Sequence, residues 1–65
     1  MNSLIIYFEY KHLPEALQII SKSCCDLAIA MDTVLPDGSE KTAGLRKLLE
    51  AKDCFVRANL PVKES

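Results

Sequence analysis

Apolar residues recur along the middle of the chain at intervals of three and four positions, which is the period of an α-helix. They form one stripe: Leu17, Ile20, Cys24, Leu27, Met31 and Val34. This is the heptad spacing of helices that pack against other helices, and Lys22 and Asp26 fall on the opposite, polar face. Pro14 followed by Glu15 is typical of a helix start. The pattern predicts an amphipathic helix over about residues 14–34.

A second amphipathic helix is expected after a break at residues 35–38, where Pro36 interrupts the helical pattern. This helix starts at Asp37 or Ser39 and runs to about residue 60, and Asp37 and Glu40 have the spacing of a capping box. Its apolar face is formed by Leu45, Leu48, Leu49, Phe55, Val56 and Leu60. Two long helices joined by about four residues predict an antiparallel hairpin.

The first twelve residues hold a dense apolar and aromatic cluster between Leu4 and Tyr10 that has no single period. A strand, a helix and an extended arm therefore all remain open for this segment. The chain as a whole is expected to be one all-α domain over residues 1–65. It would comprise an N-terminal arm or short helix (1–12), the helical hairpin (13–60) and, after Pro61, a short polar tail (61–65).

The small size of the chain matters for its stability. With 65 residues, of which 49% are hydrophobic, a single chain buries a marginal core and needs a disulfide framework, a metal or self-association. Cys24, Cys25 and Cys54 are odd in number and lack zinc-site spacing, so they are interpreted as small buried apolar residues rather than as a thiolate site or a zinc site with His12. Of the three ways to supplement a small core, only self-association is left, so we expect a helical homo-oligomer.

Some residues do not suit a monomeric hairpin. Ile19, Ile29 and Ala30 lie away from the apolar stripe, which indicates a second apolar surface and hence a second partner. Lys52 projects from the middle of the apolar face of the second helix. Such a lysine most often extends its ammonium to an edge, and the alternative is a charge that lines a subunit interface or a ligand cavity.

The charge balance excludes several partners. Eight basic and nine acidic residues give a net charge of -1, so no overall field attracts DNA or an anionic membrane. No apolar run approaches the length of a membrane span, and the first residues lack the pattern of a secretory signal. A cytoplasmic protein is therefore expected.

The sequence offers little support for catalysis. The single histidine, His12, has no nucleophile at a recognisable motif spacing, and Gly38 and Gly44 do not form a phosphate-cradling loop. We therefore expect a protein that is not an enzyme and has no cofactor. A small enzyme and a helix-turn-helix regulator are both less favoured alternatives.

Binding of an anionic, aromatic ligand is better supported. Lys41 and Thr42 occupy the first turn of the second helix, where free N–H groups and the helix dipole favour phosphate. Next to Lys11 and His12, the N-terminal segment supplies rings on which a base can stack: Tyr7, Phe8 and Tyr10. These residue types are the ones that a nucleotide requires.

Residues 36–51 contain a run with the pattern P-x-x-x-E-[KR]-[ST]-x-[AG]-L-x-K-L-x-E-A, formed by Pro36, Glu40, Lys41, Thr42, Gly44, Leu45, Lys47, Leu48, Glu50 and Ala51. This run resembles the phage anti-CBASS sponge family, whose members share a pattern close to it. The segment from Tyr10 to Pro14 is similar to the tyrosine-histidine-proline-like start of the family, so the resemblance covers residues 10–58.

The resemblance implies a non-enzymatic sponge in the cytoplasm of an infected bacterial cell. Such proteins form helical homohexamers that sequester cyclic dinucleotides, and as a further class cyclic trinucleotides, so that the CBASS effectors of the host are not activated. It also implies ligand pockets between protomers, in which Tyr10 stacks on a base and Lys22 meets phosphate. Lys41, Thr42 and His12 complete the implied ligand-binding residues. Ile19 and Ile29 would be oligomer contacts, and Lys52 could face a pocket between subunits.

One alternative function comes from a different class. A helical-hairpin dimer could bind RNA or a protein partner through one face and take no small ligand. Steep loss of RNA affinity with rising salt would distinguish this class, and the net charge of -1 weighs against it.

Overall fold

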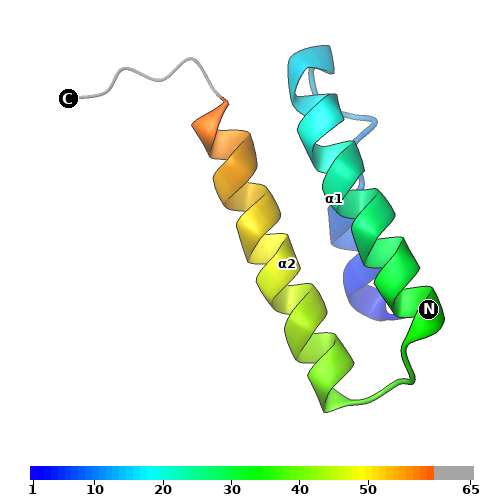
Figure 1. Ribbon diagram of the computed structural model, residues 1–65. Helices are drawn as coiled ribbons and strands as arrows, with labels where there is room; N and C mark the ends of the chain where they lie inside the picture. Colours follow the sequence, from blue (N-terminus) through cyan, green and yellow to red (C-terminus); the bar gives the residue numbers. More distant parts are fainter. Residues whose placement is uncertain (60–65) are drawn as a thin grey trace.

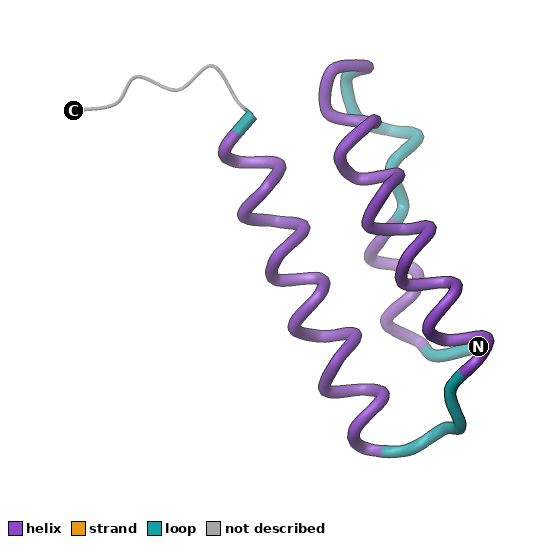
Figure 2. Tube along the Cα trace, in the orientation of Figure 1, coloured by secondary structure: helices purple, strands orange, loops and turns teal. Residues whose placement is uncertain are grey.

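Two long antiparallel helices form the frame of the molecule, and a short N-terminal helix packs against both of them. The computed structural model describes residues 1–59, which contain the 3₁₀-helix η1 (Ser3–Phe8), α1 (Glu15–Val34) and α2 (Ser39–Ala58) (Figure 1). The tube in Figure 2 shows helices joined by loops in this part of the chain, with no strand. The all-helical hairpin with a short N-terminal segment is thus confirmed. None of the described helices is long and apolar enough to cross a membrane.

The long helices begin close to the expected positions. Pro14 precedes α1 as its N-cap residue, so the helix starts one residue later than predicted. α2 starts at Ser39, the later of the two predicted positions, because Gly38 is its N-cap. The expected capping box is wrong, since no side chain caps this helix and Asp37 pairs with Lys41 instead. The predicted end near residue 60, Leu60 in its apolar face and the tail at 61–65 lie outside the described residues.

The N-terminal segment forms a short helix, which resolves the three alternatives that the sequence left open. The side chain of Asn2 caps it by accepting a 2.9 Å hydrogen bond from the N–H of Leu4. In a 3₁₀-helix, residues three apart lie above one another, so Ile5 and Phe8 share one buried face. Ile6 and Tyr7 point to solvent. The mixed pattern of this segment reflects a short helix with apolar residues on both sides.

The core lies where η1 meets the two long helices. Phe8 is fully buried there and packs in one cluster with Ile5, Cys24, Cys25, Ala28 and Leu45. Ser21, on the same side of α1, is also fully buried. The small side chains on this side of α1 leave room for the large ring of Phe8.

The buried face of α1 is therefore rotated from the predicted apolar stripe. Leu17 and Cys24 are buried as expected, but Leu27 (48% exposed), Met31 (37%) and Val34 (68%) are largely exposed. The reason is η1, which covers α1 on one side of that stripe. Half of the heptad stripe is left facing solvent in a single chain.

The cysteines divide between two environments. Cys24 and Cys25 are buried, as predicted, and burial raises the pKa of both thiols. Cys54 is exposed, so the expectation of a buried residue is wrong there, because this residue lies on the side of α2 that faces away from the core. All three thiols are unpaired within residues 1–59.

Candidate ligand-binding site

The five predicted ligand-binding residues lie in three places on one protomer. Tyr10, in the loop that precedes α1, and Lys22, on α1, lie in the same region of the protomer. His12 lies in a cleft between this loop and α2. Lys41 and Thr42 lie at the other end of the hairpin, in the first turn of α2. A single chain therefore does not gather all five around one ligand.

Tyr10 and Lys22 combine an aromatic ring with an exposed ammonium group. Tyr10 is half-buried and packs against the core cluster, which fixes its position. The hydrogen bond and the negative charge of Asp26, at 2.8 Å, raise the pKa of Lys22, and Tyr10 adds a smaller contribution. Because the Lys22–Asp26 pair is solvent-exposed, it is weak, and an incoming phosphate can replace Asp26.

Lys41 has very different surroundings. Its side chain is 4% exposed, and Nζ lies 2.7 Å from Oδ1 of Asp32 and 2.8 Å from Oδ1 of Asp37. Nζ also donates to the backbone carbonyls of Asp32 (2.8 Å) and Leu35 (3.2 Å). These carboxylates raise the pKa of Lys41, and Lys41 in turn lowers the pKa of both carboxyl groups. The positive charge of Lys41 is therefore neutralised by carboxylates of the same protomer.

Thr42 belongs to the same polar cluster through the N-terminus. The N–H of Asn2 donates to Oδ2 of Asp32 at 3.0 Å, and Nδ2 of Asn2 donates to Oγ1 of Thr42 at 3.0 Å. We call this cluster the junction; its members are Asn2, Asp32, Asp37, Lys41 and Thr42. It ties η1 to the end of α1 and the start of α2. The geometry of one chain favours a structural role for Lys41 and Thr42 over the predicted contact with phosphate.

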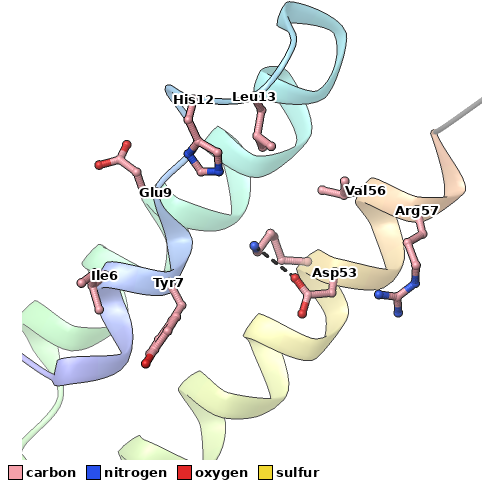
Figure 3. A pocket seen from close by; sticks show the side chains of 9 residues that line it. Ile6, Tyr7, Glu9, His12, Leu13, Asp53, Val56 and Arg57 are labelled. Atoms are coloured by element: carbon pink, nitrogen blue, oxygen red, sulfur yellow. Dashed lines mark ion pairs between the residues drawn. The ribbon is translucent and has the colours of Figure 1, made fainter.

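The His12 cleft is a hollow of about 430 Å³ between the N-terminal segment and α2. Figure 3 shows the side chains that line it: Ile6, Tyr7, Glu9, His12, Leu13, Lys52, Asp53, Val56 and Arg57. Lys52 is 13% exposed and pairs with Asp53 at 3.1 Å. The lysine on the apolar face thus lines a cavity within one protomer, which was the less favoured interpretation of its position.

The chemistry of the His12 cleft is mixed. Lys52 and Arg57 supply two positive charges, and Glu9 and Asp53 supply two negative charges, so these four charges cancel. Tyr7 offers an exposed ring at its edge. A neutral cleft gives little attraction for a polyanion, and Lys22, whose charge is paired with Asp26, offers no larger net charge. Three of the cleft's lining residues were singled out from the sequence: Tyr7 as a stacking ring, His12 as a ligand-binding residue and Lys52 as a lysine within an apolar face.

Comparisons with known proteins do not decide between these places. No family model, no curated protein and no solved structure matches the chain. Within residues 1–59, no three histidine, cysteine, aspartate or glutamate side chains gather as metal ligands would. The candidate site is therefore argued from the geometry of the chain alone.

Proposed function

We propose that the protein is a non-enzymatic sponge that binds cyclic dinucleotides and, as a further class, cyclic trinucleotides. By sequestering these messengers in the cytoplasm of an infected bacterium, it would keep CBASS effectors inactive, as proteins of the phage anti-CBASS sponge family do. The proposal rests on the half-buried ring of Tyr10, which packs against the core cluster, and on the exposed ammonium of Lys22. The pattern within residues 36–51 supports it independently.

The two residues suit the two parts of such a ligand. A base stacks on the ring of Tyr10, whose attachment to the core lowers the entropic cost of ordering it. Lys22 meets a phosphodiester with its exposed ammonium, which, like that of an ordinary lysine, is charged at neutral pH. Because the competing Asp26 is exposed and its pair with Lys22 is weak, exchanging it for a phosphate costs little.

Assembly into a homohexamer is part of the proposal. Lys22 lies ten residues before Asp32 on α1, so about 15 Å of helix separates Lys22 from the junction around Lys41. Any contact from Lys41 or Thr42 to a ligand held at Lys22 must therefore come from a neighbouring copy. Binding is stoichiometric and reversible, and a high copy number lowers the free messenger by mass action.

Titration calorimetry with a panel of cyclic dinucleotides and, separately, cyclic trinucleotides tests this function. We expect saturable binding by the intact chain. Lys22→Ala and Tyr10→Leu should each weaken it about tenfold or more, because each removes one charged or stacking contact. Tyr10→Leu keeps an apolar side chain against the core. Arg46→Ala, which removes an exposed cation from α2, is the matched control and should bind normally.

Two results would distinguish an error in the proposed function from an error in the assigned site. Absence of binding to every cyclic nucleotide would reject the sponge. Full affinity in both the Lys22 and the Tyr10 variant would reject the site while leaving the function in place. Binding of RNA with a steep salt dependence, in the absence of cyclic nucleotide binding, would instead support the alternative of an RNA-binding hairpin.

A further inference from the structure

The His12 cleft is separate from the two residues on which the proposed function rests, because neither Tyr10 nor Lys22 lines it. Its volume of about 430 Å³ lies within the range of roughly 300–1,000 Å³ that is usual for sites that hold small molecules. One wall comes from η1 and the loop that follows it, and the other wall comes from the last turns of α2. The chemistry of these two walls determines which small molecule the cleft can hold.

One part of the cleft is apolar. Figure 3 shows His12 and Leu13 of the loop and Val56 of α2 directed into the space between the two walls. Leu13 and Val56 are half-buried, so a ligand that covers them removes further apolar surface from water. Tyr7 adds an exposed ring on the side of η1. This part of the cleft suits an aliphatic or aromatic group of a ligand.

The other part of the cleft carries charges of both signs on successive turns of α2. The side chain of Asp53 is 47% exposed, and its Oδ1 pairs with Lys52 at 3.1 Å, which leaves Oδ2 without a partner within residues 1–59. Nη2 of Arg57 donates to Sγ of Cys54 at 3.4 Å, but a thiol is a weak acceptor. Asp53 and Arg57 are four residues apart on one face of α2, yet no ion pair joins them. One carboxylate and one guanidinium are thus open to a ligand.

Glu9 places a second negative charge on the opposite wall. Its Oε1 accepts hydrogen bonds from the N–H groups of Tyr10 and Lys11, at 3.1 and 3.3 Å, so the carboxylate is held by its own loop. Figure 3 shows it directed away from α2, so Glu9 contributes its charge rather than a contact. With this charge the cleft has no excess of either sign, and a molecule that carries both charges gains from each of them.

We propose that the His12 cleft binds a small zwitterion with an apolar side chain, which is the chemistry of a free α-amino acid. The ammonium group of the ligand lies against Asp53, and its carboxylate lies against Arg57. Because an α-amino acid carries both charges on one carbon, it suits two opposite charges that are one helical turn apart. Its side chain lies between Leu13 and Val56. This binding activity goes beyond the proposed function and needs no cyclic nucleotide.

Titration of the isotope-labelled full chain with L-phenylalanine and with L-leucine, followed by the amide NMR signals, tests this site. We expect saturable shifts at the residues that line the cleft. N-acetyl-L-phenylalanine lacks the ammonium and L-phenylalanine amide lacks the carboxylate, so each should bind about tenfold more weakly than L-phenylalanine. Arg57→Gln and Asp53→Asn should each weaken binding of L-phenylalanine by about the same factor. Arg46→Gln is the matched control, since Arg46 is exposed on α2 but lies outside the cleft.

Absence of saturable shifts with both amino acids would overturn the site. So would an acetylated derivative that binds as tightly as the free amino acid, because the cleft would then be a site for a simple anion. Unchanged affinity in both Arg57→Gln and Asp53→Asn would place the ligand elsewhere. Both side chains reach solvent, so the variants should keep their helices, as circular dichroism would show. Amino acid binding that persists in Lys22→Ala would support the cleft even if no cyclic nucleotide binds.

Discussion

Lys22 and Lys41 are the same residue type and were both expected at phosphate, yet the fold gives them opposite surroundings. Lys22 is exposed and holds one exposed carboxylate, whereas Lys41 is buried between two carboxylates and two backbone carbonyls. Helical spacing reveals the pairing of Lys41 with Asp37, four residues away. It does not reveal Asp32, which approaches only because the hairpin closes. At the scale of the residue, therefore, the sequence identifies the cationic side chains but does not show which of them are free to bind a ligand.

The junction predicts a specific pH dependence of stability. Because the pKa values of Asp32 and Asp37 lie below their ordinary value of 3.8, their contribution is complete above that pH and is lost as the pH falls through the lowered values. The raised pKa of Lys41 means that its contribution holds below pH 10.5 and is lost as the pH rises further.

The variant Asp32→Asn tests this dependence. It should lower the melting temperature at neutral pH and flatten the loss of stability in acid, because one of the two titrating carboxyl groups is gone. Thermal unfolding followed by circular dichroism between acid and neutral pH measures both effects. Asp26→Asn, at an exposed pair, is the control and should shift little. If the melting temperatures of the wild type and Asp32→Asn fell equally steeply with falling pH, that result would contradict the role of the junction.

Ser21 gives a second prediction at this scale. Its Oγ is fully buried and has no hydrogen-bond partner among residues 1–59, so it carries a desolvation cost without a compensating bond. Ser21→Ala should therefore increase the free energy of unfolding by about 1 kcal/mol. Urea denaturation measures it, with Ser23→Ala as the control, since Ser23 is exposed and donates to the carbonyl of Ile19. A loss of stability in Ser21→Ala would mean that the hydroxyl is bonded in the folded protein.

At the scale of the element, the long helices follow from the sequence and the short one does not. Pro14 and the 35–38 break set helix limits that agree with the structure to about one residue at three of the four ends, because proline acts locally on the backbone. The direction in which α1 faces could not be predicted in the same way. It depends on η1, which contacts both long helices and covers the small residues of α1.

Phe8 is the residue through which η1 docks, and it gives the prediction at this scale. Phe8→Ala should lower the free energy of unfolding by about 3–5 kcal/mol, because it leaves a cavity in the middle of the core cluster. Tyr7→Ala, one residue earlier but 60% exposed, should change it by about 0.5 kcal/mol or less. Chemical denaturation of both variants makes the comparison, and equal losses would show that η1 does not pack as described.

At the scale of the whole molecule, the sequence predicts that the chain associates with copies of itself, and this stays a prediction. Within residues 1–59, several exposed large hydrophobic side chains line the groove between the two long helices: Ile19, Leu27, Met31, Leu35 and Phe55. The candidate site is less accessible to sequence reasoning. Tyr10 and Lys22 could be proposed only from a resemblance, and the His12 cleft brings together Tyr7, Lys52 and Arg57 from distant positions. The spacing of residues along the chain does not show which residues far apart in the sequence come into contact in the fold.

The most direct test of the proposed function is co-sedimentation of the intact chain with a cyclic dinucleotide. The chain has no tryptophan and two tyrosines, so absorbance by the bases reports the nucleotide almost alone. We predict that this absorbance moves with an oligomer of the wild-type chain and remains at the position of free nucleotide with Lys22→Ala. Nucleotide that stays free beside a sedimenting wild-type protein, for cyclic dinucleotides and cyclic trinucleotides alike, would contradict the sponge.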